Sequence, residues 1–235
     1  MIILFSQTEF TITPDQIRTQ EKLAVFLAFI AGYLDAVGIL KWKIYVSFMS
    51  GNTTQLGVAL SSGKLVVMIT TFAVIACFML GIYAGTCLSL WKNSKTQTLP
   101  FYIVSGILLI YTGVAQYYNI SIVLSIAVIG FSTGVMNTIV TSVGNQNINT
   151  DFVTGTLNSL SRSIAMLSMS GDQTDKKQYK INAMRLSLLW IGFISGAFTS
   201  PFVLPRLGNW TLSLPAIALV ICSLLLPIKN FNLKK

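Results

Sequence analysis

Asp35 is the one acidic residue that lies inside a long apolar segment of this 235-residue chain. A carboxylate in hydrocarbon is costly, so such a group normally faces a polar interior, pairs with a neighbour or takes up a proton. Two roles follow for Asp35. It can serve as a proton or cation site on a transport path, or it can form a hydrogen bond that holds two helices together. The sequence leaves both roles open.

Two short polar motifs interrupt apolar sequence, and each is centred on a glycine. Ser50-Gly51-Asn52-Thr53 follows Phe48-Met49, and Thr154-Gly155-Thr156 follows Phe152-Val153. Serine and threonine suit a helix N-cap, and glycine permits close backbone approach. A helix that begins at each motif would direct free N–H groups and its positive dipole end at an anionic or polar solute. Alternatively, each motif only caps a helix and packs it against a neighbour.

The same order of residues occurs twice along the chain, which predicts an internal repeat. Gly32–Ala36 aligns with Gly134–Thr138 at an offset of 102 residues, and Phe48–Asn52 aligns with Phe152–Thr156 at an offset of 104. Asn137 therefore occupies the place of Asp35 in the second half, which predicts one titratable site instead of two.

Two groups of candidate residues follow from these motifs. The residues expected along a substrate or ion pathway are Asp35, Ser50, Gly51, Asn52, Thr53, Asn137, Thr154, Gly155 and Thr156. The second group consists of glycines spaced as in close helix crossings, for which we expect a packing role. These are Gly81 and Gly85, which align with Gly192 and Gly196 at an offset of 111 residues.

Composition indicates an integral membrane protein, because 53% of the residues are hydrophobic and only 10% are charged. A membrane-spanning helix takes about 20 apolar residues. Six segments meet this expectation: Leu23–Leu40, Leu65–Trp91, Leu99–Gln116, Ile120–Val143, Ile181–Leu204 and Thr211–Ile228. Val46–Ser61 and Phe152–Ser170 are shorter or more polar, and we expect them to be half-helices or interfacial helices.

The predicted fold is an all-α polytopic membrane helix bundle with about six transmembrane helices, two short half-helices and a 3+3 inverted-topology repeat. Three spans per half would make the second half enter from the opposite side, as in many secondary transporters. The expected divisions are an N-terminal segment at 1–22, repeats at 23–118 and 119–228, and a tail at 229–235.

The positive charges predict the orientation of these spans. With the N-terminus inside, 12 of the 16 Lys and Arg residues fall on the inner side, and only Lys41, Lys43, Lys64 and Arg206 fall on the outer side. Cytoplasmic loops carry the excess of Lys and Arg. We therefore expect both termini in the cytoplasm, with no removable signal peptide.

Several functional classes are disfavoured by what the chain lacks. It contains no histidine, and its three cysteines lie apart within apolar runs without CxxC spacing. We expect no metal, no cofactor and no enzymatic activity, since neither a metal-ligand cluster nor paired intramembrane carboxylates are present. The scattered basic residues also do not indicate nucleic-acid binding.

A family resemblance becomes specific at the two motifs. Gly32–Gly38 and Val46–Thr53 resemble the bacterial YoaK-like family of six-span inner-membrane proteins, which carry a domain of unknown function. Members typically read Gly-x-x-Asn-Ala and Tyr/Phe-Val-Thr-Gly-Thr-Leu in the second half. Here these fall on Gly134–Thr138, with Thr138 in place of alanine, and on Phe152–Leu157. The resemblance implies the fold and the inner-membrane location but no biochemical activity.

The leading functional hypothesis is a small secondary transporter or permease of unknown substrate, with Asp35 as a proton or cation site. The alternative is a non-transporting scaffold or assembly protein in which the polar motifs only pack helices. The expected partners are the lipid bilayer and a small solute or ion, and a homodimer is compatible with either hypothesis.

Overall fold

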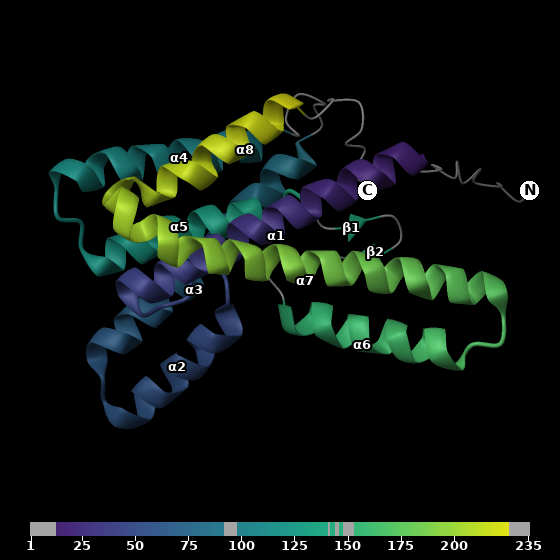
Figure 1. Cartoon of the computed structure of the whole chain (residues 1–235). Coiled ribbons are helices and arrows are strands. Elements are labelled where there is room, and N and C mark those ends of the chain that lie inside the picture. The colour runs from purple at the N-terminus through teal and green to yellow at the C-terminus, as the bar shows by residue number, and fades with distance from the viewer. Residues whose placement is uncertain (1–12, 92–97, 141, 144–145, 148–152, 226–235) are drawn as a thin grey trace, which may run out of the picture.

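The computed structural model describes residues 13–91, 98–140, 142–143, 146–147 and 153–225, and nearly all of them are helical. The helices are α1 (Pro14–Trp42), α2 (Met49–Ser62), α3 (Leu65–Leu90), α4 (Leu99–Tyr117), α5 (Ile122–Met136), α6 (Val153–Met169), α7 (Gln173–Leu207) and α8 (Ser213–Leu225). A 3-10 turn, η2 (Gly208–Leu212), joins α7 to α8, and two short antiparallel strands, β1 (Ser142–Val143) and β2 (Gln146–Asn147), follow α5. The predicted helix bundle is confirmed in this coarse form (Figure 1).

Helix α1 begins well before its apolar segment. Thr13 caps it by accepting from the Gln16 backbone N–H while the Gln16 side chain accepts from the Thr13 N–H, and Pro14 occupies the first helical position. This reciprocal arrangement satisfies two donors that a helix start otherwise leaves free. Residues 14–22, expected as a separate segment, therefore continue the helix that contains Leu23–Leu40.

The segment Ile120–Val143 was predicted as one span, and that extent is wrong. Helix α5 ends at Met136, and Val143 lies in strand β1. Asn137 caps the helix, and the Thr138 and Ile139 N–H groups bond to Val135 and Met136 three residues back. These tighter bonds turn the chain out of the helix, as at many helix ends.

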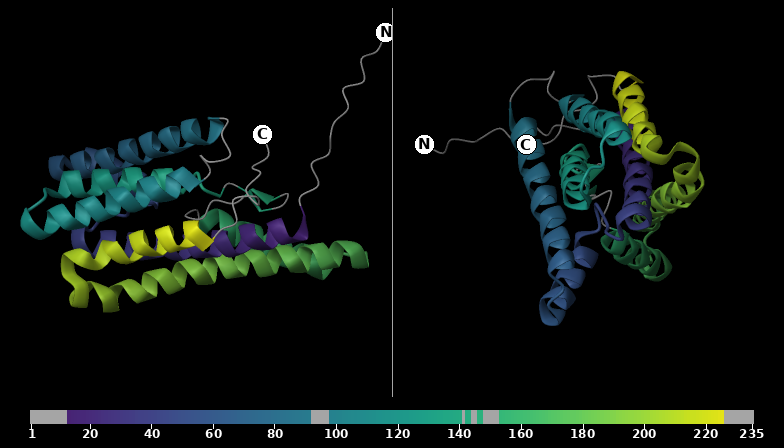
Figure 2. Two further views of the ribbon diagram at one scale, coloured as in Figure 1. Left: turned by 90° about the horizontal axis from the view of Figure 1, so that it is seen from above. Right: turned by 90° about the vertical axis from the view of Figure 1, so that its left-hand side faces the viewer.

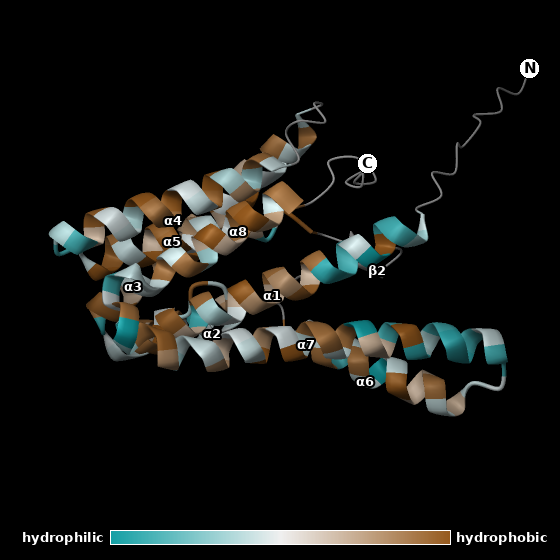
Figure 3. Ribbon diagram, turned by 45° about the horizontal axis from the view of Figure 1, so that its top comes forward, coloured by the Kyte–Doolittle hydropathy of each residue, from teal (hydrophilic) through white to brown (hydrophobic). Residues whose placement is uncertain are grey.

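Four helical runs of the described residues are long and apolar enough to cross a membrane. They are α1, α3, α4 and the continuous run Gln173–Leu225 formed by α7, η2 and α8. Helix α5 is apolar but has only 15 residues. Hydrophobic residues occur along all the long helices of the bundle, whereas the first turns of α1 and α7 are mostly hydrophilic (Figure 3).

The long helices pack in pairs that join distant parts of the chain. Helix α1 lies along α7 and α3 lies along α5, and α4 contacts α8 (Figures 1 and 2). Glycines permit the close approach. A Cβ atom at Gly196 would lie 2.8 Å from the carbonyl carbon of Phe29, and one at Gly32 would lie 2.9 Å from that of Phe193.

The other pair is built in the same way. A Cβ atom at Gly81 would lie 3.0 Å from the carbonyl carbon of Phe131, and one at Gly134 would lie 3.0 Å from that of Phe78. The backbones of α3 and α5 are therefore in direct contact, as in small-residue crossings of membrane helices. Gly85 and Gly192 lie at the same two crossings, beside Thr138 and Val25.

The two shorter helices, α2 and α6, lie beside α3 and α7 respectively. Helix α2 runs from the middle of the molecule to one end of the bundle, and α6 runs from the middle to the opposite end (Figure 1). The N-terminal ends of both helices therefore lie toward the middle. Their bounds agree with the two short helices expected from the sequence, except that residues 46–48 belong to the linker between α1 and α2, which comprises residues 43–48.

Candidate functional site

The side chain of Asp35 is buried in α1 and holds the linker between α1 and α2. It is only 4% exposed. Its Oδ1 accepts from the backbone N–H groups of Val46 at 2.8 Å and Ser47 at 2.7 Å, and Oδ2 lies 2.8 Å from the Ser47 hydroxyl. Both carboxyl oxygens are thus engaged by residues 11 and 12 positions further along the chain.

Two further side chains bond to the same linker. The Thr133 hydroxyl of α5 donates to the Val46 carbonyl at 2.7 Å, and the Asn52 amide of α2 donates to the Tyr45 carbonyl at 2.8 Å. Both side chains are buried. The linker is therefore held by three helices. Thr133 was not among the predicted site residues, although its place beside Gly134 in an apolar helix was a signal.

The first polar motif lies in the first turn of α2 rather than before it. The N-cap is Phe48, which makes no side-chain capping bond, so the expected N-cap role of Ser50 is wrong. Ser50 is exposed, and the Thr53 hydroxyl donates to the Met49 carbonyl of its own helix at 2.8 Å. Neither side chain bonds to another helix in the described part of the chain.

Gly51 makes room for an aromatic ring. A Cβ atom there would lie 2.5 Å from two carbons of the Phe48 ring. That ring meets the Tyr45 ring edge to face, with 5.1 Å between centroids. Glycine was expected to permit a close approach, and here the approaching group is a side chain of the preceding linker, which covers the start of α2.

The second motif occupies the corresponding place in α6. Thr154, Gly155 and Thr156 lie in its first turn, while residues 148–152, which precede it, are outside the described part. Asn137 caps α5, and its Oδ1 is buried without a hydrogen-bond partner among the described residues. The Oδ1 of Asn52 is in the same situation. Both are acceptor oxygens.

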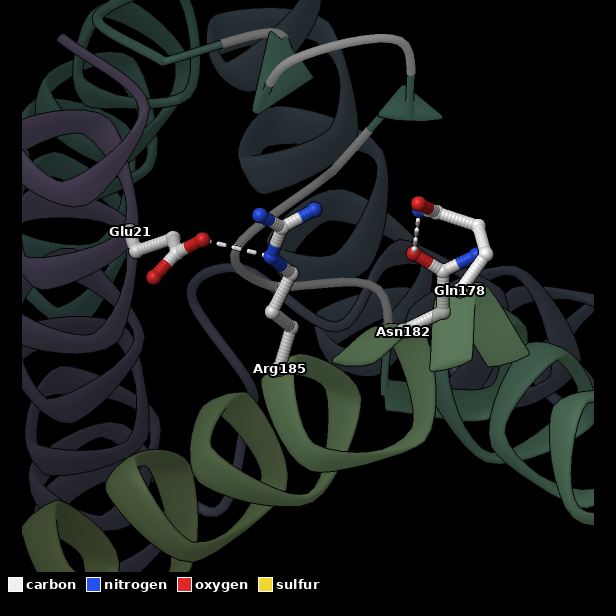
Figure 4. A network of polar contacts seen from close by, with 4 residues as sticks. All are labelled: Glu21, Gln178, Asn182 and Arg185. Carbon is white, nitrogen blue, oxygen red and sulfur yellow. Dashed lines mark hydrogen bonds and ion pairs between the residues drawn. The ribbon is translucent and has the colours of Figure 1, made fainter. Parts of the chain in front are cut away.

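An ion pair joins α1 to α7 near the N-terminal end of α1. Glu21 Oε1 lies 2.5 Å from Arg185 Nε, and both side chains are partly buried (Figure 4). Gln178 donates to Asn182 at 3.1 Å one turn away on α7. The pair adds a polar contact to the interface between α1 and α7 that Gly32 forms with Phe193.

Among the described residues, no group of three or more His, Cys, Asp or Glu side chains could hold a metal ion. Cys77, Cys87 and Cys222 are free thiols. The site that the residues do build is a hydrogen-bonded linker at the start of α2, with one buried acceptor oxygen, Asn52 Oδ1, on α2.

Comparison with known proteins supports the membrane class and identifies the family. No solved structure matches the chain. The chain is 26% identical over 196 residues to UPF0700 transmembrane protein RA0705 of Rhizobium meliloti (strain 1021). The aligned region covers 83% of this chain and 81% of that protein. Residues 23–225 match the family described as "Protein of unknown function (DUF1275)". This confirms the resemblance to the YoaK-like family, and the chain is a membrane protein that belongs to the DUF1275 family.

Proposed function

We propose that this protein is a small secondary transporter or permease whose solute path passes between the N-terminal ends of α2 and α6. One observation carries the proposal: both half-helices begin toward the middle of the bundle and run to opposite ends (Figure 1). Discontinuous helices of this kind form the midplane binding sites of many transporters, because their free N–H groups and positive dipole ends attract polar or anionic groups.

An inverted repeat is part of the proposal, and the glycine contacts support it. Gly32 meets Phe193 and Gly134 meets Phe78, and these are corresponding contacts if α1 aligns with α5 and α3 aligns with α7. The same alignment relates the contact of Gly196 with Phe29 to the contact of Gly81 with Phe131.

These reciprocal contacts favour a different register from the one expected for the second glycine pair. Gly81 corresponds to Gly196, at an offset of 115 residues, instead of to Gly192 at 111. The difference is about one turn of a helix. In this arrangement each closely packed pair contains one helix from each half.

The proposed topology has six crossings, with both termini in the cytoplasm and the protein in the inner membrane. Helices α5 and α8 are short, and the chain beside them, 137–140 and η2, completes their crossings. The excess of Lys and Arg on the predicted inner side supports this orientation.

Asp35 is the proposed proton or cation site. Its donors among the described residues are neutral, and no Lys or Arg forms an ion pair with it there. A buried carboxylate without a positive partner within a membrane helix is a common feature of proton and cation pathways.

A scaffold without transport is the second candidate, and a specific observation favours it. Both oxygens of Asp35 are occupied by the linker of the same half, which is what a purely structural hydrogen bond would require. Under this alternative, Asp35 fixes the start of α2 and exchanges nothing with solvent.

Flux measurements separate the two candidates. The purified protein is reconstituted in vesicles that contain a pH-sensitive dye, and gradients of H⁺, Na⁺ or K⁺ are imposed with and without a membrane potential. A transporter coupled at Asp35 gives flux above that of protein-free vesicles, and Asp35→Asn reduces it. Flux equal to that of empty vesicles under every gradient, or unchanged flux in Asp35→Asn, contradicts this coupling.

A further inference from the structure

Both backbone polar groups of Val46, its N–H and its carbonyl, are hydrogen-bonded to side chains, and these side chains come from different halves of the chain. Its N–H donates to Asp35 at 2.8 Å, and its carbonyl accepts from Thr133 at 2.7 Å, 87 residues away. The side chains of Val46 and Thr133 are almost fully buried. Water therefore cannot replace a lost hydrogen-bond partner there, and a buried N–H or carbonyl group without a partner lowers the stability of the fold.

The Thr133 hydroxyl has one hydrogen and two acceptors in reach, Val46 at 2.7 Å and Gly130 of its own helix at 2.9 Å. The Gly130 carbonyl lies in a helix interior, where a backbone N–H can satisfy it. The Val46 carbonyl lies in a linker, and no backbone N–H of the described residues donates to it. Satisfaction of both acceptors therefore requires that the hydroxyl point at Val46.

The linker in turn fixes the first turn of α2. Met49 N–H donates to the Ser47 carbonyl at 3.0 Å, and the Asn52 side chain donates to Tyr45 at 2.8 Å. Apart from these bonds, α2 packs chiefly on α3. A group that holds Val46 therefore also sets where the N-terminal end of α2 lies.

We propose that Thr133 is a positioning residue, which holds the start of α2 through the Val46 carbonyl and so couples α5 of the second half to the first half-helix. Its importance for transport rests on the proposed function. In the proposed repeat Thr133 corresponds to Ala31, and Asp35 corresponds to Asn137. The Thr133 hydroxyl and the Asp35 carboxylate, which hold the linker between α1 and α2, are thus replaced by a methyl group and an amide at the corresponding positions.

Thiol labelling tests this role without any solute. Cys77, Cys87 and Cys222 are first replaced by alanine. A reporter cysteine is then placed at Ser50, exposed in the first turn of α2, or at Ser61, exposed in its last turn. The labelling rate with a small maleimide is measured for the full chain in vesicles.

Thr133→Val removes the hydroxyl and keeps the shape of the side chain, whereas Thr133→Ser keeps the hydroxyl. Ser132→Ala is the matched control, because within the described part of the chain the Ser132 hydroxyl bonds only to Val128 of its own helix. Thr133→Val is expected to change the rate at Ser50 by about fivefold or more, as the loss of one buried hydrogen bond implies. The rate at Ser61 stays unchanged, and Thr133→Ser and Ser132→Ala behave as the parent.

An unchanged rate at Ser50 in Thr133→Val, an equal change at Ser61, or no rescue by Thr133→Ser overturns the proposal. If Thr133→Val does not accumulate in the membrane, Thr133→Ala carries the same test. If neither Thr133→Val nor Thr133→Ala accumulates while Thr133→Ser does, the hydroxyl is required for folding, and that result also overturns the positioning proposal. Absence of flux in the parent protein contradicts the transport proposal alone, since labelling needs no flux.

Discussion

Gly196→Ala is expected to destabilise the protein because α1 and α7 meet backbone to backbone at this position. The added Cβ would lie 2.8 Å from the Phe29 carbonyl carbon and 2.9 Å from the Tyr33 nitrogen. Carbon atoms in van der Waals contact are about 3.5 Å apart or more, so the helices must separate by at least about 0.7 Å, and the Phe29 carbonyl oxygen lies closer still to the added Cβ. Overpacking of this kind costs about 1–3 kcal/mol, against a gain of about 0.5–1 kcal/mol for alanine in a helix.

The difference between these ranges is a net loss of about 0–2.5 kcal/mol in the free energy of unfolding, and we expect about 1–2 kcal/mol because the atoms that meet the Cβ belong to the backbone. It is measured by SDS titration in mixed micelles, followed by tryptophan fluorescence. Gly106→Ala in α4 is the control, because a Cβ there would meet nothing within 4 Å. This control is expected to be neutral or slightly stabilising.

Double substitutions test which glycines share a crossing. Gly32→Ala and Gly196→Ala act on the same pair of helices, so the second costs less once the first has separated them, with a coupling energy of about 0.5 kcal/mol or more. Gly196→Ala and Gly134→Ala act on different pairs and are expected to add. Additive effects at Gly32 and Gly196 together with coupling to Gly134 would refute the helix pairing described above.

Three further predictions concern the linker and the ion pair. Asp35→Ala is expected to cost several kcal/mol in unfolding free energy, since it leaves two buried N–H groups unbonded. Asp35→Asn keeps an acceptor oxygen and is expected to cost less. An equal loss of unfolding free energy in the two variants, measured by the same titration, would argue against this role of the Asp35 oxygens. Gly51→Ala displaces the Phe48 ring at a small cost, and adding Gly51→Ala to Phe48→Ala should cost nothing more. Glu21→Gln weakens the contact with Arg185 by about 1 kcal/mol or less, and the loss shrinks as salt is raised; a loss that does not depend on salt would contradict an ionic contribution.

Much of the fold could be predicted because it depends on local composition. Long apolar runs identified α1, α3 and α4, and the two glycine-centred motifs identified the starts of α2 and α6 to within a few residues. The end of α5 could not be predicted in this way, because Ile139, Val140 and Val143 continue the apolar pattern after the helix has ended. Hydropathy indicates which residues are compatible with lipid, but it does not show where the hydrogen-bond pattern of a helix ends.

The candidate site was predicted less completely, since its bonds are made over long sequence distances. The sequence drew attention to Asp35 and Asn52, but not to their partners in the linker. Thr133 joins Val46 across 87 residues, and no local pattern specifies such a pair. Gly51 was found for its lack of a side chain, yet only the structure places the Phe48 ring in that space.

Labelling from the two sides of the membrane tests the central claim, that the half-helices α2 and α6 run from the middle to opposite faces. Single cysteines at Ser61, near the end of α2, and Ser168, near the end of α6, are both at exposed positions. In the chain without its native cysteines, a membrane-impermeant maleimide is added to intact cells and to inverted vesicles. The inverted arrangement predicts that Ser61→Cys reacts only from outside and Ser168→Cys only from the cytoplasmic side. Reaction of both from the same side would contradict it.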